Sequence, residues 1–159
     1  MRDSNLPGER RSDSQFEDGE LTKRIIGCSM RVHSNLGCGF QEVVYQNSLG
    51  IELSKEGLNF LREYEMPIRY EGQIVGSRRV DFLVEQRVSV ELKAVVALED
   101  IHLAQAKNYL EAYKLRVGLL INFGSTSLEF KRMINSKAPM LPPNIPNLYN
   151  PLNRPRNPI

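Results

Sequence analysis

Two stretches of alternating residues, separated by three polar ones, constrain the fold more than any other feature of the sequence. In Val80–Val84 and again in Val88–Ala94, apolar side chains occupy every second position. That period is typical of β-strands with one buried face. The residues between them, 85–87, are Glu, Gln and Arg. The pattern predicts an antiparallel hairpin with a three-residue loop.

The length of that loop decides which side chains lie together. Paired residues in an antiparallel hairpin share one face, so Asp81 and Glu91 can meet only across a loop of odd length. A three-residue loop places them opposite each other, with Cβ atoms about 4.5–5.5 Å apart. Lys93 shares the strand face of Glu91. At that separation, two carboxylates can hold one divalent cation.

Acids and a lysine on such apolar strands are costly to bury unless they are paired or bound. The alternative is an exposed strand face on which these charges are simply solvated. The helix that follows favours burial, because it carries matching polar groups. Gln105 and Tyr109 lie four residues apart on one face, and His102 and Tyr113 extend that stripe. Taken alone, this stripe could instead be the partly exposed edge of a helix.

Apolar periodicity predicts the other elements of a mixed α/β domain. The predicted helices are 21–35, 41–56 and 99–113. The predicted strands are 58–70, 73–84, 88–96, 117–123 and 128–133. Glycines at 37 and 39 should end the first helix, and Gly57 lies just beyond the second. Candidate core positions on these two helices are Ile25, Ile26, Met30, Val32, Val43, Val44, Leu49 and Leu53.

The composition fits one domain with a substantial core. The chain has 159 residues, of which 41% are hydrophobic, and a net charge of +2. Its two cysteines, Cys28 and Cys38, are too few for a disulfide scaffold and are expected to be small buried residues. No apolar run approaches the roughly 20 residues of a membrane span. We therefore expect a cytoplasmic protein without a membrane partner.

The two ends differ from the middle of the chain. Residues 1–20 are rich in charge and poor in apolar side chains, so we expect them to be disordered. Residues 136–159 contain seven prolines and five asparagines, which exclude helix and central strand. We expect a flexible, solvated tail, with a docking segment as the alternative. The folded domain is thus predicted to be 21–135.

One segment resembles a known family. Gly39-Phe40-Gln41-Glu42-Val43-Val44-Tyr45 matches the Gly-x-x-Glu-x-x-Tyr signature of the GxxExxY proteins. The resemblance extends from Ile25 to Met133. It includes Asp81, Glu91-Leu92-Lys93 and Gln105-x-x-x-Tyr109. GxxExxY proteins look like RecB-like members of the PD-(D/E)XK nuclease superfamily. The implied fold is a restriction-endonuclease-like α/β core, a mixed central sheet flanked by helices. One departure is visible, since Val80 stands where a proline often precedes the aspartate.

The resemblance implies a metal site. Asp81 and Glu91 would be ligands, with the backbone carbonyl of Leu92 as a further one. Mg²⁺, or Mn²⁺, suits such hard oxygen donors. Lys93 would orient or help deprotonate the attacking water and stabilise charge on the scissile phosphate.

Three further residues receive roles from the same resemblance. Glu42, at the start of the second helix, would approach the metal or its water. Gln105 and Tyr109 would position the site or the phosphate backbone.

The implied function is hydrolysis of phosphodiester bonds by a metal-dependent nuclease, with nucleic acid as partner and DNA favoured over RNA. The first alternative is a module with the same fold and a vestigial site, binding nucleic acid or protein without cleavage. The second is a component of a larger assembly that docks through the proline-rich tail. An intact set of two acids and a lysine favours the enzyme. Against it, residues 21–135 hold 15 Lys/Arg and 13 Asp/Glu, with little of the basic excess typical of duplex binding.

Overall fold

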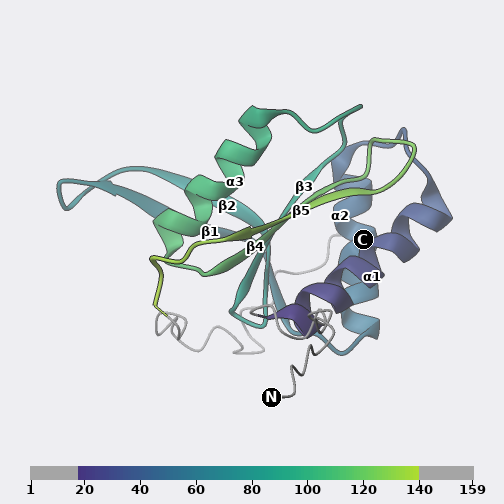
Figure 1. Ribbon diagram of the computed structural model, residues 1–159, viewed down its shortest axis with the longest axis horizontal. Helices are drawn as coiled ribbons and strands as arrows, with labels where there is room; N and C mark the ends of the chain where they lie inside the picture. Colours follow the sequence, from purple (N-terminus) through teal and green to yellow (C-terminus); the bar gives the residue numbers. More distant parts are fainter. Residues whose placement is uncertain (1–17, 140–159) are drawn as a thin grey trace, which may run out of the picture.

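The computed structural model describes residues 18–139, which form a five-stranded sheet with helices on both faces (Figure 1). Helix α1 begins at Gly19, inside the segment predicted to be disordered. Residues 1–17 of that segment, and residues 140–159 of the predicted flexible tail, lie outside the described residues. Within 18–139, no helix is long and apolar enough to cross a membrane.

Two helices precede the sheet, as predicted. Helix α1 spans Gly19–Leu36 and helix α2 spans Glu42–Lys55. Helix α1 ends at Gly37, whose φ of 69° is one that residues with a side chain rarely adopt. The predicted core positions Leu49 and Leu53 are buried. The predictions for Met30 and Val43 were wrong, because their side chains are 48% and 52% exposed.

The strands form one mixed sheet in the order β1-β2-β3-β4-β5. Their bounds are Phe60–Tyr70, Gln73–Val84, Val88–Lys93, Val117–Asn122 and Glu129–Ile134. Strands β1, β2 and β3 pair in antiparallel order, and β5 is antiparallel to β4. Strands β3 and β4 are parallel and are connected by helix α3, Asp100–Tyr113. Strand β3 ends at Lys93, three residues before the predicted end.

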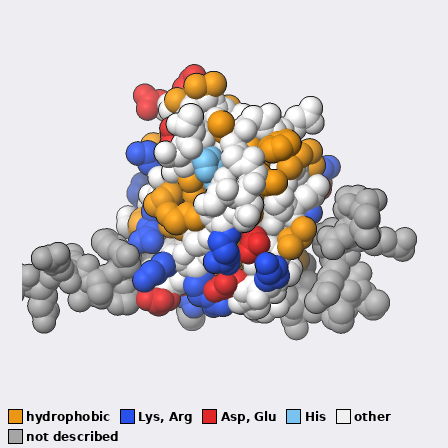
Figure 2. Space-filling model, turned by 90° about the vertical axis from the view of Figure 1, so that its right-hand side faces the viewer, with side chains coloured by type: hydrophobic (Ala, Val, Ile, Leu, Met, Phe, Trp, Pro, Cys, Tyr) orange, Lys and Arg blue, Asp and Glu red, His pale blue; other side chains and the backbone are white. Residues whose placement is uncertain are grey.

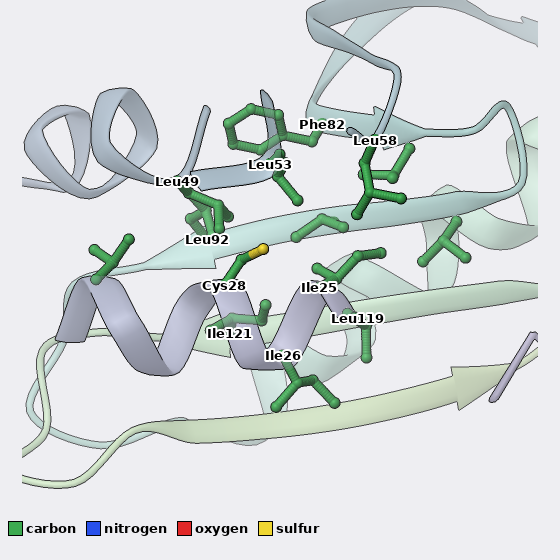
Figure 3. Close-up of a cluster of buried hydrophobic side chains, with 14 of the residues drawn as sticks. Ile25, Ile26, Cys28, Leu49, Leu53, Leu58, Phe82, Leu92, Leu119 and Ile121 are labelled. Atoms are coloured by element: carbon green, nitrogen blue, oxygen red, sulfur yellow. The ribbon is translucent and has the colours of Figure 1, made fainter. Parts of the chain in front are cut away.

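The sheet separates two hydrophobic clusters. One lies between the sheet and helices α1 and α2, where Ile25, Leu49 and Phe82 are fully buried (Figure 3). The other lies beneath α3 and includes Leu110 and Leu120. Because both faces are covered, central strand β4 is buried along its whole length, as its continuous apolar sequence predicts.

Strands β1 and β2 continue beyond the sheet as a two-stranded ribbon (Figure 1). Strand β3 pairs only with residues 82–84 of β2, whereas the β1–β2 pairing extends to Tyr70 and Gln73. Apolar side chains at the end of the ribbon are exposed, with Tyr70 at 69% and Ile74 at 61%. The ribbon begins next to Asp81, so β1 and β2 leave the five-stranded sheet beside the predicted site.

Cys28 and Cys38 occupy different environments. Cys28 is buried between the first two helices, as predicted. Cys38 is exposed, which corrects the expectation that both cysteines are buried. It lies in the short connection between α1 and α2, where no layer of the fold covers it.

Candidate active site at the divergence of β2 and β3

The hairpin register confirms the prediction from loop length. Phe82 pairs with Val90 and Val84 with Val88, so residues 85–87 form a three-residue loop. Glu85 and Gln86 both have positive φ, of 52° and 57°, which closes the turn. Continued by one step, this register would pair Asp81 with Glu91, as predicted. The described pairs stop just before that position.

The prediction assumed a regular strand at Asp81, and the structure has a distortion there instead. Glu63, on neighbouring β1, has a φ of 49°, which is uncommon for a residue with a side chain. Side-chain alternation breaks at this point of β2. Val80 and Leu83, three residues apart, both join the cluster beneath α3, and Phe82 joins the opposite cluster. Asp81 therefore does not follow the regular side-chain alternation of β2, and it lies where β2 separates from β3.

The Asp81 carboxylate is fixed by contacts from two elements. Its Oδ2 accepts a hydrogen bond from the backbone N–H of Leu92, at 2.7 Å. Its Oδ1 accepts one from Nε2 of Gln46 on α2, at 3.4 Å. Burial raises the pKa of Asp81 to about 6, against the lowering effect of the Leu92 N–H. The charge of Glu42 raises it further.

Glu91 is the most deeply buried acid of the site. It is 8% exposed, which excludes the solvated strand face considered above. It pairs in parallel register with Leu120, a member of the cluster beneath α3. Its Oε1 is buried and has no hydrogen-bond partner among the described residues. Burial, followed by the charge of Asp81, raises the pKa of Glu91 to about 8.

Lys93 and Glu42 complete a group of four charged residues. Lys93 is the last residue of β3 and is half-buried. Burial raises the pKa of the Glu42 carboxyl, and the Lys93 ammonium opposes that shift. Lys93 likewise opposes the burial-driven rise in the pKa of Asp81 and of Glu91. The fold thus brings three acids around one lysine.

Glu42 is delivered by the loop between α1 and α2. It is the first residue of α2. The hydroxyl of Tyr45, three residues later, donates to the carbonyl of Gly37 at 2.7 Å and accepts the N–H of Phe40 at 3.2 Å. The tyrosine of the Gly-x-x-Glu-x-x-Tyr segment therefore fastens the loop from which Glu42 projects.

The polar residues of α3 have separate roles. Burial raises the pKa of the Tyr109 hydroxyl, and the charge of Glu91 raises it further. Its hydroxyl donates to the carbonyl of Arg79 at 2.9 Å, which ties α3 to the base of the ribbon. Gln105 is half-buried one turn earlier, and the structure gives it no hydrogen bond to the other predicted site residues within 18–139. His102 caps the helix, since its Nδ1 accepts the N–H of Glu99 at 3.0 Å.

Sequence reasoning missed three residues in or next to this site. Gln46 binds Asp81, Arg62 binds Gln46, and Arg78 places its guanidinium 3.8 Å from the centre of the Tyr109 ring. For Gln46 a signal existed, because it follows Glu42 by four residues and so lies on the same face of α2. The two arginines follow no comparable spacing, and only the folded sheet brings them here.

The donor set of this group suits a hard cation. No three His, Cys, Asp or Glu side chains within 18–139 converge in a geometry that could hold a metal ion. Asp81 and Glu91, however, are neighbouring carboxyls whose pKa values burial raises, and one oxygen of Glu91 has its hydrogen-bonding capacity unused. A divalent cation would supply that missing partner and stabilise both charged forms.

Comparison with known proteins identifies the family. A solved structure titled "Crystal structure of SSO0001" is 15% identical to the chain, with a TM-score of 0.42, and the match covers 77% of this chain and 79% of that one. No curated protein matches the sequence. The family model of the PD-(D/E)XK nuclease superfamily matches residues 19–133. Because that match takes in every helix and strand described here except the end of β5, the chain belongs to the PD-(D/E)XK nuclease superfamily.

Proposed function

We propose that this protein is a metal-dependent nuclease that hydrolyses phosphodiester bonds in nucleic acid. The observation that carries the proposal is the buried, unpartnered Oε1 of Glu91 beside Asp81 and Lys93. Burying a carboxylate oxygen without a hydrogen-bond partner destabilises a fold. Such an arrangement in a member of a nuclease superfamily is explained by a ligand that binds the folded site.

Asp81 and Glu91 are the proposed metal ligands, with the backbone carbonyl of Leu92 as a third. Mg²⁺ or Mn²⁺ is the ion that these oxygen donors favour. A bound divalent cation of this kind lowers the pKa of its water and polarises phosphoryl oxygens. The structural support is the hydrogen bond from the N–H of Leu92, the residue after Glu91, to Oδ2 of Asp81 at 2.7 Å, together with the effect of the Asp81 charge on the pKa of Glu91.

Four side chains have proposed roles around that pair. Lys93 orients the attacking water and stabilises charge on the phosphate, because its ammonium lies among the acids. Glu42, at the start of α2 and within electrostatic range of Lys93, holds the water. Tyr109 and Gln105, one turn apart on α3, position the phosphate backbone.

We also propose that the protein belongs to the GxxExxY group of the superfamily, because of the structure of its Gly-x-x-Glu-x-x-Tyr segment. In that segment Tyr45 fastens the loop, Gly39 has a φ of 108° that favours glycine, and Glu42 starts the helix. The proposed substrate is nucleic acid, with DNA favoured over RNA.

One observation favours the vestigial module as a second candidate. Basic and acidic side chains are interspersed on the face shown in Figure 2, and Arg31 forms ion pairs with Glu52 and Glu56 between α1 and α2. Charges paired in this way are less available to phosphates. A module that binds without cleaving would retain the fold and show no metal-dependent turnover.

Cleavage assays separate the two candidates. The full chain is incubated with single- and double-stranded DNA and RNA, in Mg²⁺, Mn²⁺ or EDTA. We expect cleavage of DNA that requires metal and is abolished in Asp81→Asn and Glu91→Gln. Glu111→Gln, an exposed acid on α3, is the matched control and should cleave as wild type does. Binding of these substrates without cleavage in any metal would refute the nuclease and support the vestigial module.

A further inference from the structure

We infer that Gln46 and Arg62 are positioning residues that hold the Asp81 carboxylate in place for metal binding. The inference rests on the proposed function and adds to it two residues that are not part of the motifs on which the family resemblance was based. It concerns how the ligand is oriented, and neither residue is assigned a contact with the metal or the substrate.

The three side chains form a continuous chain of hydrogen bonds. The guanidinium of Arg62 on β1 donates a hydrogen bond from Nη2 to Oε1 of Gln46 at 3.0 Å. The other end of the same amide, Nε2 of Gln46, donates to Oδ1 of Asp81 at 3.4 Å. Gln46 is buried, with 7% of its surface exposed, so water cannot readily replace these partners.

The arginine decides which end of the amide faces Asp81. Arginine has only donors, so it can pair only with the oxygen of Gln46 and thereby directs the NH₂ group toward the carboxylate. Arg62 is itself held in place. Its Nη2 also donates to Oδ1 of Asn47 at 2.8 Å, and its guanidinium lies 5.7 Å from the centre of the Phe82 ring. The chain of bonds therefore has one direction.

Asp81 needs such support because of its place in the sheet. The pairing of β2 with β3 stops at Phe82, and the register of β1 pairs Val80 and Phe82 but gives no partner to Asp81, so no ladder pair fixes residue 81. Leu92 N–H holds Oδ2 and Gln46 holds Oδ1, so both oxygens are oriented and each retains a lone pair for a cation. Groups that orient a metal ligand in this way typically alter metal affinity about 10- to 100-fold when they are replaced.

The test is a calorimetric titration of the full chain with Mn²⁺ alone, without nucleic acid. Gln46→Met and Arg62→Met should each bind Mn²⁺ about 10- to 100-fold more weakly than wild type. Arg62→Lys retains a cationic donor and should recover part of the loss. The matched control is Arg31→Met. It also removes an arginine, but that arginine pairs with Glu52 and Glu56 and not with Gln46. Its Mn²⁺ affinity should equal that of wild type.

Thermal unfolding of each variant without metal shows whether that variant is folded. Gln46→Met and Arg62→Met interrupt the same chain of hydrogen bonds, so the test remains valid if one of them does not fold. Unchanged Mn²⁺ affinity in folded Gln46→Met and Arg62→Met, with binding lost in Asp81→Asn, would refute the positioning role and leave the proposed metal site intact. Weaker binding in Arg31→Met to the same extent would also refute it, because the effect would then be general. If wild type does not bind Mn²⁺, the proposed function fails first.

Discussion

Replacing Glu91 by glutamine should make the metal-free protein more stable at neutral and alkaline pH. Burial, followed by the charge of Asp81, raises the pKa of Glu91 from 4.5 to about 8 in the folded protein. The folded state therefore binds the proton more tightly than the unfolded state. The contribution of Glu91 to stability is complete below pH 4.5 and is lost as pH rises from 4.5 to about 8. Glutamine keeps the shape of the side chain and does not ionise.

The size of the effect follows from that interval. Each pH unit corresponds to about 1.4 kcal/mol, so the full interval amounts to about 5 kcal/mol above pH 8. At pH 7 most of the folded protein has a neutral Glu91, and the loss is about 3 kcal/mol. These values are upper limits, because local opening of the strand end can hydrate a charged Glu91. Either loss is a large part of the roughly 5–15 kcal/mol that stabilises a domain.

The assay is urea unfolding at several pH values from 5 to 8, in EDTA. We expect the free energy of unfolding of Glu91→Gln, relative to wild type, to increase steadily with pH. Glu111→Gln is the control, because this exposed residue on α3 should give a difference that does not change with pH. A difference between Glu91→Gln and wild type that is independent of pH, or that favours wild type as pH rises, would refute the reasoning.

Three further outcomes are expected from the same structure. Mg²⁺ or Mn²⁺ should raise the thermal midpoint of wild type by mass action, and in Lys93→Ala this stabilisation should persist while cleavage is lost, as a melt and a gel assay would show. Tyr45→Phe removes both loop hydrogen bonds of the hydroxyl and should lower the free energy of unfolding by about 1–3 kcal/mol in urea. Gly118→Ala places a Cβ 2.8 Å from the Ser89 hydroxyl and should cost about 1–3 kcal/mol, whereas Gly76→Ala meets nothing within 4 Å and should lack this packing penalty.

The hairpin and its register could be read from the sequence because the physics there is local. Alternation fixes which side chains of a strand share a face, and an odd loop fixes which residues pair. The pairing of Phe82 with Val90 confirms this prediction. The same holds for helix ends at glycine, such as Gly37, where backbone conformation alone stops the helix.

Local patterns failed where a position depends on what packs against it. Met30 and Val43 are apolar and lie on the expected helices, yet both are exposed, because each helix buries only the face that meets the sheet or its neighbour. Periodicity shows that such a face exists. Only the assembled layers decide its exact width and direction.

Some features of the candidate site also follow from local sequence, and others depend on packing. The sequence by itself determined that Asp81, Glu91 and Lys93 lie on adjacent strands, since strand period and loop length suffice for that. Only the tertiary structure decided that β2 leaves β3 at Asp81, that Glu91 is buried without a partner for Oε1, and that Gln46 bonds the Asp81 carboxylate while Arg62 bonds Gln46. These features join strands and a helix that are distant in sequence. Their free energies depend on burial and on contact geometry, and neither is encoded in the spacing of residues along the chain.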